Sequence, residues 1–346
     1  MYDSKYMISI KNFLPILIMG SVISACDTHE LESAQNTDKA SGSITRMDPR
    51  LDAIVPPKTN IEKLAGGFIF LEGPVWHKET KQLFFSDVRD NASYVWSEEA
   101  GVSDFIKPIF SGKANGRSVG SNGLTIDKNG CLIILEHGHR RLSKACLTEP
   151  IQRKILADNY NGQRFNSPND STWHSDGSLY FTDPPYGLAD LESDPERDLN
   201  FNGIYRLKTD GTIDLLFAGQ SRPNGIALSP DEKILYVANS DAADKVWFAY
   251  DVLYDGSLVN PRIFFDANDQ AAPGAPDGMK VDLNGNIFAT GPGGVWIFDS
   301  AGTHLGTINT GEVTANVAWG NDGSMLYLTS STSLYRIKLN TRGEIL

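Results

Sequence analysis

Five copies of a short motif place an oxygen-bearing side chain four positions before an apolar residue. The first copy is Glu72-Gly73-Pro74-Val75-Trp76 and the fifth is Asp277-Gly278-Met279-Lys280-Val281. Asn122, Asn169 and Asn224 hold the same position in the three copies between them. Stacked copies of a repeat place equivalent residues at equivalent points in space, so these side chains are expected to meet. Carboxylate and amide oxygens bind hard cations, so the motif predicts a metal site.

The donor types indicate which metal to expect. Glu72 and Asp277 supply two negative charges, and Asn169 and Asn224 supply neutral amide oxygens. No Cys or His stands at these positions, which disfavours zinc and copper. Four protein oxygens leave a calcium ion open positions for water and substrate. We therefore expect one divalent metal as cofactor, Ca²⁺ first, with Mg²⁺, Mn²⁺ or Zn²⁺ as the alternatives.

A turn is the simpler interpretation of any single Asn-Gly or Asp-Gly pair, because both are common turn dipeptides. Five copies in phase, with acids in the first and the fifth, favour a shared site instead. A looser sixth copy, Asn316-Val317-Ala318-Trp319, is displaced by one residue. We expect Asn316 to close the ring of repeats and not to take part in the chemistry.

Short strands are the elements that must position this ring. Apolar runs follow turn signals, as Ser178–Thr182 follows Ser175-Asp176-Gly177 and Ile234–Ala238 follows Ser229-Pro230-Asp231. Four short strands fit each repeat of roughly 40 to 50 residues, which is typical of a β-propeller blade. Six repeats predict an all-β, six-bladed β-propeller in which each innermost strand begins near the central channel.

Three segments are expected along the chain. Residues 1–26 resemble a lipoprotein signal peptide, because an apolar run ends in Ile23-Ser24-Ala25-Cys26. Cys26 would then carry the lipid, and the protein would sit at the periplasmic face of the inner or outer membrane; an ordinary cleaved signal peptide is the alternative. Residues 27–58 are polar and predict a flexible tether. Residues 59–346 predict the propeller domain, closed by pairing of a strand near Ile61–Phe70 with the last strand.

Composition excludes little beyond nucleic acid. The net charge is −12, and a phosphate backbone requires a basic surface. The membrane is expected to be contacted through the lipid anchor alone, and the oligomeric state stays open. Cys131 and Cys146 flank an expected hairpin, and export permits a disulfide between them. Two buried free thiols are the equal alternative.

Longer motifs resemble a known family, the gluconolactonases, which include regucalcin and are related to diisopropyl fluorophosphatase. The resemblance runs from about residue 50 to the C-terminus. The motifs that carry it are Glu72-Gly73-Pro74-Val75-Trp76, Arg164-Phe165-Asn166-Ser167-Pro168-Asn169-Asp170, Tyr180-Phe181-Thr182-Asp183-Pro184-Pro185-Tyr186-Gly187, Arg222-Pro223-Asn224-Gly225-Ile226-Ala227 and Pro276-Asp277-Gly278-Met279. One departure is the extra Ser167-Pro168, which shifts Arg164 relative to Asn169 when compared with regucalcin-like members.

This resemblance implies a six-bladed propeller that hydrolyses a sugar lactone with one divalent metal in its channel. The metal ligands that it implies are Glu72, Asn169, Asn224 and Asp277. Asp277 is expected to act as general base, and His137 as proton donor or substrate contact, with a surface histidine as the equal alternative. The expected substrate contacts are Asn122, Arg164, Asp183 and Tyr186.

Two other functions compete with this prediction. A phosphotriesterase-like hydrolase could use the same metal, and a calcium-stabilised propeller could bind sugar or protein without catalysis. Residues Leu188–Asn200 and Asp266–Pro276 are expected to form lids over the site.

Overall fold

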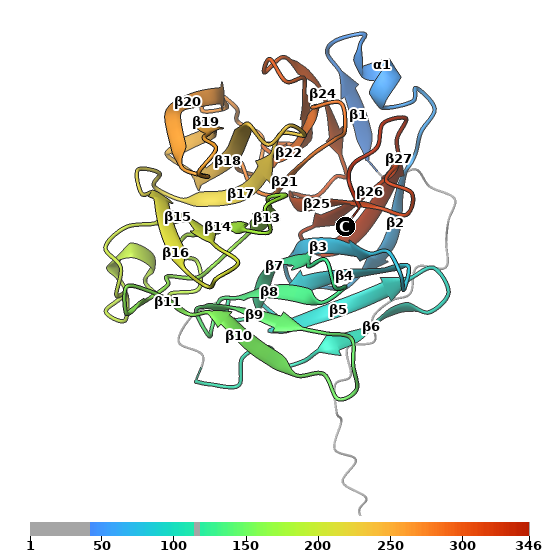
Figure 1. Ribbon diagram of the computed structural model, residues 1–346. Helices are drawn as coiled ribbons and strands as arrows, with labels where there is room; N and C mark the ends of the chain where they lie inside the picture. Colours follow the sequence, from blue (N-terminus) through green and yellow to red (C-terminus); the bar gives the residue numbers. More distant parts are fainter. Residues whose placement is uncertain (1–41, 114–117, 346) are drawn as a thin grey trace, which may run out of the picture. The chain divides into compact units, whose positions relative to one another are not determined.

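The computed structural model of this protein describes residues 42–113 and 118–345. These residues fold almost entirely into strands, which form six antiparallel sheets of four or five strands arranged around a common centre (Figure 1). The predicted six-bladed β-propeller is therefore confirmed. In the part of the chain that the structure describes, no helix is long and apolar enough to cross a membrane.

Each sheet is built from strands that follow one another along the chain, with two exceptions. These are the two N-terminal strands, each of which joins the edge of one of the last two sheets. The first three sheets contain β3 (Leu71–His77), β4 (Gln82–Asp87), β5 (Ala92–Ser97) and β6 (Gly101–Ile106); β7 (Ser121–Ile126), β8 (Leu132–Glu136), β9 (Arg141–Ala145) and β10 (Arg153–Ala157); and β13 (Ser171–Trp173), β14 (Leu179–Asp183), β15 (Gly203–Leu207) and β16 (Ile213–Phe217).

The other three sheets include the two N-terminal strands at their outer edges. They contain β17 (Pro223–Leu228), β18 (Ile234–Asp241), β19 (Asp244–Val252) and β20 (Leu258–Asp266); β21 (Met279–Val281), β22 (Ile287–Gly291), β23 (Gly294–Phe298), β24 (His304–Asn309) and β1 (Ser43–Arg46); and β25 (Thr314–Gly320), β26 (Met325–Ser330), β27 (Ser333–Lys338) and β2 (Ile61–Gly66). The short elements α1 (Leu51–Ile54), η1 (Leu191–Ser193) and the hairpin β11 (Asn159–Tyr160) with β12 (Gln163–Arg164) complete the fold.

In two blades the tight turn between the first two strands begins with an aspartate. In the second blade, Asp127 Oδ1 accepts the backbone N–H groups of Asn129 and Cys131 at 2.9 and 3.0 Å, and Gly130 takes a φ of 73°. Asp282 binds the backbone of its turn in the same way in the fifth blade. Such Asx turns fix the hairpins that follow Asn122 and Asp277, which is why the turn signals in the sequence marked these strands correctly.

The ring of blades closes as expected. β2 pairs antiparallel with β27, with Ile61 opposite Ile337. The N-terminal strand thereby covers the edge of the last blade, so that this edge is not free to pair with another chain.

The tether predicted for residues 27–58 is wrong from residue 42 onward. β1 pairs antiparallel with β24, with Ser43 opposite Asn309, and α1 follows it. Leu51 and Val55 are 0% exposed and belong to a core cluster shared with the fifth and sixth blades. The few apolar residues of this polar segment therefore attach it to the propeller by packing in its core. Cys26 and residues 27–41 lie outside the described residues.

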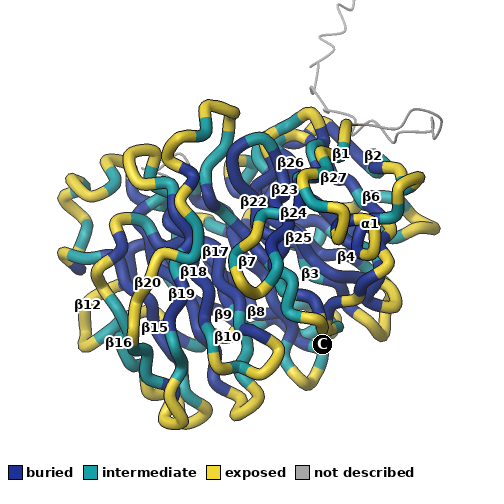
Figure 2. The backbone as a smooth tube through the Cα atoms, turned by 90° about the horizontal axis from the view of Figure 1, so that it is seen from above, coloured by how far each residue is buried: buried dark blue, intermediate teal, exposed yellow. Residues whose placement is uncertain are grey.

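The core lies between neighbouring blades. Figure 2 shows buried backbone through the strands and exposed backbone mainly in the connecting loops. Trp76 stacks on Tyr327 across the first and sixth blades at 5.5 Å, and Trp319 meets the edge of Phe288 across the sixth and fifth at 4.9 Å. Trp173 is only partly buried against its cluster. Trp76 and Trp319 are thus part of the core between blades.

A disulfide joins Cys131 to Cys146. These residues directly precede β8 and follow β9, which pair with Leu132 opposite Ala145. The register that the sequence left open therefore places the two thiols opposite each other.

Candidate active site

The five in-phase polar residues gather at one cavity of about 770 Å³. Glu72, Asn122 and Asn224 lie in the innermost strands of their blades, and Asn169 and Asp277 lie two residues before theirs. They meet because the first strands of the blades surround the channel. Glu72, Asn122, Asn169 and Asn224 are at most 4% exposed, and Asp277 is partly exposed. The sequence pattern therefore predicted this convergence correctly.

The glycine after the polar residue permits close approach between blades. A Cβ at Gly73 would lie 2.0 Å from the Asn122 carbonyl oxygen, and one at Gly225 would lie 2.1 Å from that of Asp277. Gly73 has a φ of 51°, whereas Gly225 lies in β17 where its pairing with β18 shifts register between Pro223 and Ile226. The turn interpretation of these dipeptides is therefore wrong, because each glycine makes room for the ring residue of a neighbouring blade.

Buried hydroxyl groups on the second strands hold the ring backbone in place. The Thr182 hydroxyl donates to the Asn224 carbonyl oxygen at 2.7 Å, and the Thr329 hydroxyl donates to that of Asn316 at 3.1 Å. The Thr290 hydroxyl lies 3.0 and 2.9 Å from the carbonyl oxygens of Gly278 and Ala315. The recurrence of a hydroxyl residue near the end of these strands was a sequence signal for the ring that the motif analysis missed.

Asp170 adds a third carboxyl group that sequence reasoning missed. It stands where four of the five motif copies have glycine, and its side chain is 2% exposed. The Asn316 amide donates to Glu72 Oε2 at 3.2 Å and lies 3.4 Å from Asp170 Oδ2. Asn316 thus links two carboxyl groups of the ring, and the missing glycine was the signal for Asp170.

Burial is the main cause that raises the pKa values of the three carboxyl groups, and charge repulsion adds to it at Glu72 and Asp277. Burial raises the pKa of Glu72 to about 7, with a further contribution from Asp170. Burial also raises the pKa of Asp170. The pKa of Asp277 lies well above its ordinary value because of burial and the negative charges of Glu72 and Asp170. A group of buried acids in this state is stabilised by a cation bound among them.

Buried oxygen atoms without donors support a cation at this place. Asn122 Oδ1, Asn169 Oδ1 and Asp277 Oδ1 are buried and accept no hydrogen bond from any described residue. Buried acceptors normally have a partner, so this group fits metal ligation. Within the described ranges no cluster of three His, Cys, Asp or Glu side chains could hold a metal. A site here therefore depends on the asparagine oxygens together with Glu72 and Asp277.

His137 follows β8 and lines the same cavity. It is 1% exposed, and neither ring nitrogen has a partner among the described residues. Burial lowers the pKa of His137 to about 4, so the imidazole is neutral near pH 7. The alternative of a surface histidine is therefore excluded by its burial. His139 instead contacts the buried Glu136 carboxylate at 2.5 Å.

The four expected substrate contacts divide into two groups. Asn122 and Tyr186 line the cavity. Arg164 is exposed in β12, and neither it nor Asp183 is among the cavity-lining residues. Asp183 is 0% exposed and accepts the backbone N–H groups of Asn166 and Ser167, both at 2.8 Å. The expected substrate contact by Arg164 and Asp183 is thus corrected, because Asp183 positions the loop that leads to Asn169.

One wall of the cavity comes from the expected lid after β14. Leu188, Ala189, Asp190, Leu191 and Ser193 line the cavity, whereas Asp266–Pro276 contributes no lining residue.

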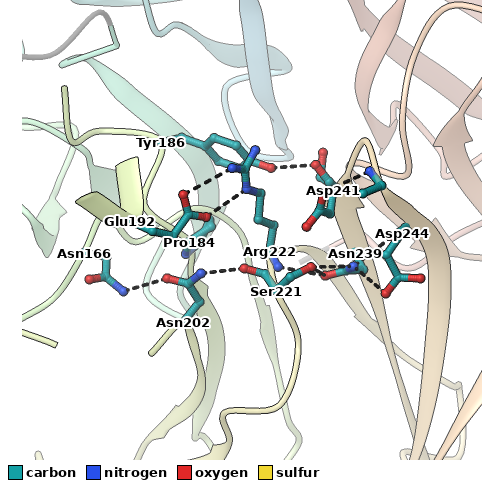
Figure 3. Close-up of polar contacts among 12 residues, drawn as sticks. Asn166, Pro184, Tyr186, Glu192, Asn202, Ser221, Arg222, Asn239, Asp241 and Asp244 are labelled. Carbon is teal, nitrogen blue, oxygen red and sulfur yellow. Dashed lines mark hydrogen bonds and ion pairs between the residues drawn. The ribbon is translucent and has the colours of Figure 1, made fainter. Parts of the chain in front are cut away.

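Polar contacts with the fourth blade fix this wall (Figure 3). Arg222 donates to both carboxylate oxygens of Glu192 at 3.0 and 3.2 Å and lies over the Tyr186 ring at 5.8 Å. The Tyr186 hydroxyl donates to the Ser240 carbonyl oxygen at 2.9 Å.

Comparison with known proteins agrees with this geometry. A family model described as the SMP-30/gluconolactonase/LRE-like region matches residues 70–332. The chain belongs to this family. It is 40% identical over 346 residues to the gluconolactonase of Zymomonas mobilis, covering 95% of each chain. The resemblance found in the motifs is therefore confirmed.

Two more distant similar proteins are named as a pentonolactonase and a gluconolactonase. The pentonolactonase XacC of Haloferax volcanii is 28% identical over 267 residues, covering 75% of this chain and 81% of the relative. The solved structure of a gluconolactonase from Xanthomonas campestris has a TM-score of 0.74 at 28% identity and covers 88% of this chain and 96% of that one.

Proposed function

We propose that this chain is a metal-dependent lactonase that hydrolyses a sugar lactone in the cavity of about 770 Å³. The observation that carries the proposal is the set of buried oxygen atoms without donors on Asn122, Asn169 and Asp277. The names of the relatives, gluconolactonase and pentonolactonase, support the substrate class.

Glu72, Asn169, Asn224 and Asp277 would hold one divalent cation, Ca²⁺ first, with Mg²⁺, Mn²⁺ and Zn²⁺ as alternatives. When bound, such an ion supplies polarisation of the lactone carbonyl and stabilisation of the negative charge that develops on its oxygen. Asp170 and Asn316 would help to position Glu72, because Asn316 links the Glu72 and Asp170 carboxyl groups.

The chain's own residues carry the proton transfers. The Asp277 carboxylate takes a proton from a water molecule while the water oxygen forms a bond to the lactone carbonyl carbon. The ester bond to the ring oxygen then breaks, and that oxygen takes up the proton that Asp277 accepted, which leaves an open-chain hydroxy acid and restores the carboxylate. Neutral His137 has one N–H donor and one free lone pair, so it can hydrogen-bond a substrate hydroxyl or the departing ring oxygen.

Two further residues would orient the sugar. The Asn122 side chain presents an unpaired amide oxygen to the cavity, which can accept a hydrogen bond from a sugar hydroxyl. The hydroxyl of Tyr186 already donates to Ser240, so its ring face is the surface available to the substrate.

The test is hydrolysis of glucono-1,5-lactone by wild type and by Asp277→Asn, each with and without EDTA, together with the metal content of both proteins. A positioned base contributes typically about 10² to 10⁴ in rate, so we expect a loss of that order in the variant and a loss with EDTA that Ca²⁺ restores. Full activity in the chelated wild type or in the variant would contradict the mechanism. An organophosphate assayed in parallel separates the phosphotriesterase alternative, and the absence of turnover on either substrate favours a binding protein.

We also propose that the protein is exported and lipidated on Cys26, as its position after Ile23-Ser24-Ala25 suggests. Incorporation of labelled palmitate in a bacterial host should be lost in Cys26→Ser. Equal labelling of the variant would contradict lipidation at this residue.

A further inference from the structure

The cavity wall formed by the first blade carries an arginine. Arg89 lies in the turn between β4 and β5 and lines the cavity together with Phe70 and Val88. Tyr186 and Ser240 belong to the third and fourth blades, on the far side of a six-bladed ring. A substrate bound at the ring of polar residues therefore lies between Arg89 and the lid wall.

Arg89 is an exposed residue that lines the cavity, and hydrogen bonds fix the backbone just before it. The Asp87 carboxylate accepts the backbone N–H groups of Ile69 and Phe70 at 2.7 and 3.0 Å, and the Val88 N–H donates to the Phe70 carbonyl oxygen at 3.1 Å. The guanidinium group lies 4.9 Å from the centre of the Phe70 ring. Hydrogen bonds thus join the turn to the backbone of Phe70, and a cation–π contact places the guanidinium over the Phe70 ring.

Arg89 differs from Arg222, which supports the opposite wall without lining the cavity, in having no acidic partner. Arg222 is paired with Glu192, whereas Arg89 forms no ion pair or hydrogen bond with any residue in ranges 42–113 and 118–345. It is also the one Lys or Arg among the described residues that line the cavity. The other charged lining residues are acids: the proposed cation would balance the charges of Glu72 and Asp277, and Asp190 would repel an anion.

An unpaired guanidinium in a cavity has a defined chemical preference. Its planar, charged donors match a carboxylate or phosphate with two parallel hydrogen bonds, and a charge-assisted bond of this kind is stronger than one to a neutral hydroxyl. A neutral sugar lactone gives Arg89 no such partner, whereas a lactone with an acidic substituent does.

We propose that Arg89 determines specificity by binding an anionic substituent, a carboxylate or a phosphate, at the end of the substrate away from the ester. The preferred substrates are then lactones of aldaric or uronic acids, or of phosphorylated sugar acids. This proposal rests on the lactonase function proposed above and names its substrate class. Arg89 offsets the repulsion between such a substrate and Asp190, so its contribution weakens as ionic strength rises.

The test compares three substrates, namely neutral glucono-1,5-lactone, glucaro-1,4-lactone with a carboxylate, and 6-phosphoglucono-1,5-lactone with a phosphate. The measured quantity is kcat/KM for each acidic lactone divided by kcat/KM for the neutral one. We expect this ratio to fall by about tenfold or more in Arg89→Met, mainly through KM, because a contact remote from the ester stabilises ground state and transition state alike. Arg89→Lys keeps the charge and should retain part of the ratio.

Arg262→Met is the matched control, because Arg262 is exposed and paired with Asp251 on the outer strands of the fourth blade. Its ratio should equal that of wild type. A fall confined to one acidic lactone supports the proposal and identifies the group that Arg89 binds. An unchanged ratio in Arg89→Met for both acidic lactones overturns it.

The failure of this proposal is distinguishable from failure of the lactonase function. If wild type hydrolyses none of the three lactones, calorimetric binding of the stable anion glucarate to wild type and Arg89→Met still tests the anion contact. About tenfold weaker binding to Arg89→Met supports the contact, and equal affinity overturns it.

Discussion

At the scale of single residues, the channel combines charge repulsion with unpaired acceptors. Burial raises the pKa of Glu72, Asp170 and Asp277, and repulsion between the acids adds to the rise at Glu72 and Asp277. Nothing in the repeat pattern required the third acid. Four ligand candidates were predictable because the repeat phase superimposes them. The places of Arg164 and Asp183 away from the cavity were not predictable, because a motif shows which residues occur together and not which way their side chains point.

His137 provides a pH-dependent prediction at this scale. Its pKa is about 4 in the folded protein against an ordinary value of 6.5, so between these values the unfolded chain binds a proton that the folded chain does not. The free energy of unfolding is therefore undiminished above about pH 6.5 and falls as the pH drops toward about 4. His137→Gln removes this term. Between about pH 7.5 and about pH 4.5, wild type should lose about 2 to 3 kcal/mol more stability than the variant.

Urea unfolding of both proteins at the two pH values measures this difference. All other titrating groups are common to both proteins, so their contributions cancel in the comparison. The same loss of stability in wild type and variant would show that His137 is not held neutral by burial.

At the scale of elements, the wall after β14 depends on contacts between two blades. Arg222 is held in place on the fourth blade by its own backbone N–H, which donates to Asn239 Oδ1 at 2.8 Å, while its side chain binds Glu192 of the wall. The sequence predicted a lid here from its length and charge. It could not predict the Glu192–Arg222 ion pair, because a pair separated by 30 residues forms only once two blades stand side by side.

Loss of the Glu192–Arg222 pair should loosen the wall. Glu192→Gln removes the ion pair, and Arg222→Met also removes the contact with the Tyr186 ring. Both side chains are partly exposed, so global stability should change by no more than about 1 kcal/mol. Local opening should rise instead, and limited trypsin digestion should cleave after Arg197 several-fold faster, with a higher KM for the lactone.

The exposed Asp251–Arg262 pair on the outer strands of the fourth blade is the control for this prediction. Asp251→Asn should leave cleavage after Arg197 unchanged. If Glu192→Gln and Arg222→Met are digested at the rate of wild type, the pair does not hold the wall.

At the scale of the whole molecule, two N-terminal strands complete the ring of blades. β2 closes the sixth blade, and β1 with α1 covers the outer edge of the fifth. The closing strand was predictable, because a propeller whose last repeat lacks a fourth strand must find one elsewhere. The role of residues 42–58 was not predictable, because their composition is polar and their few apolar residues are buried only by packing against the fifth and sixth blades.

Leu51 tests whether this segment belongs to the domain. Its side chain is 0% exposed and packs in the cluster that joins the fifth and sixth blades, where a Cβ on Gly306 would come within 2.5 Å of it. Leu51→Ala leaves a cavity in that cluster and should lower the free energy of unfolding by about 2 to 5 kcal/mol. Lys58→Ala, at an exposed site in the same segment, should change it by less than about 0.5 kcal/mol. Urea denaturation measures both values. If the two variants are equally stable, the segment is an appendage of the propeller, and the boundary expected at residue 59 is the correct one.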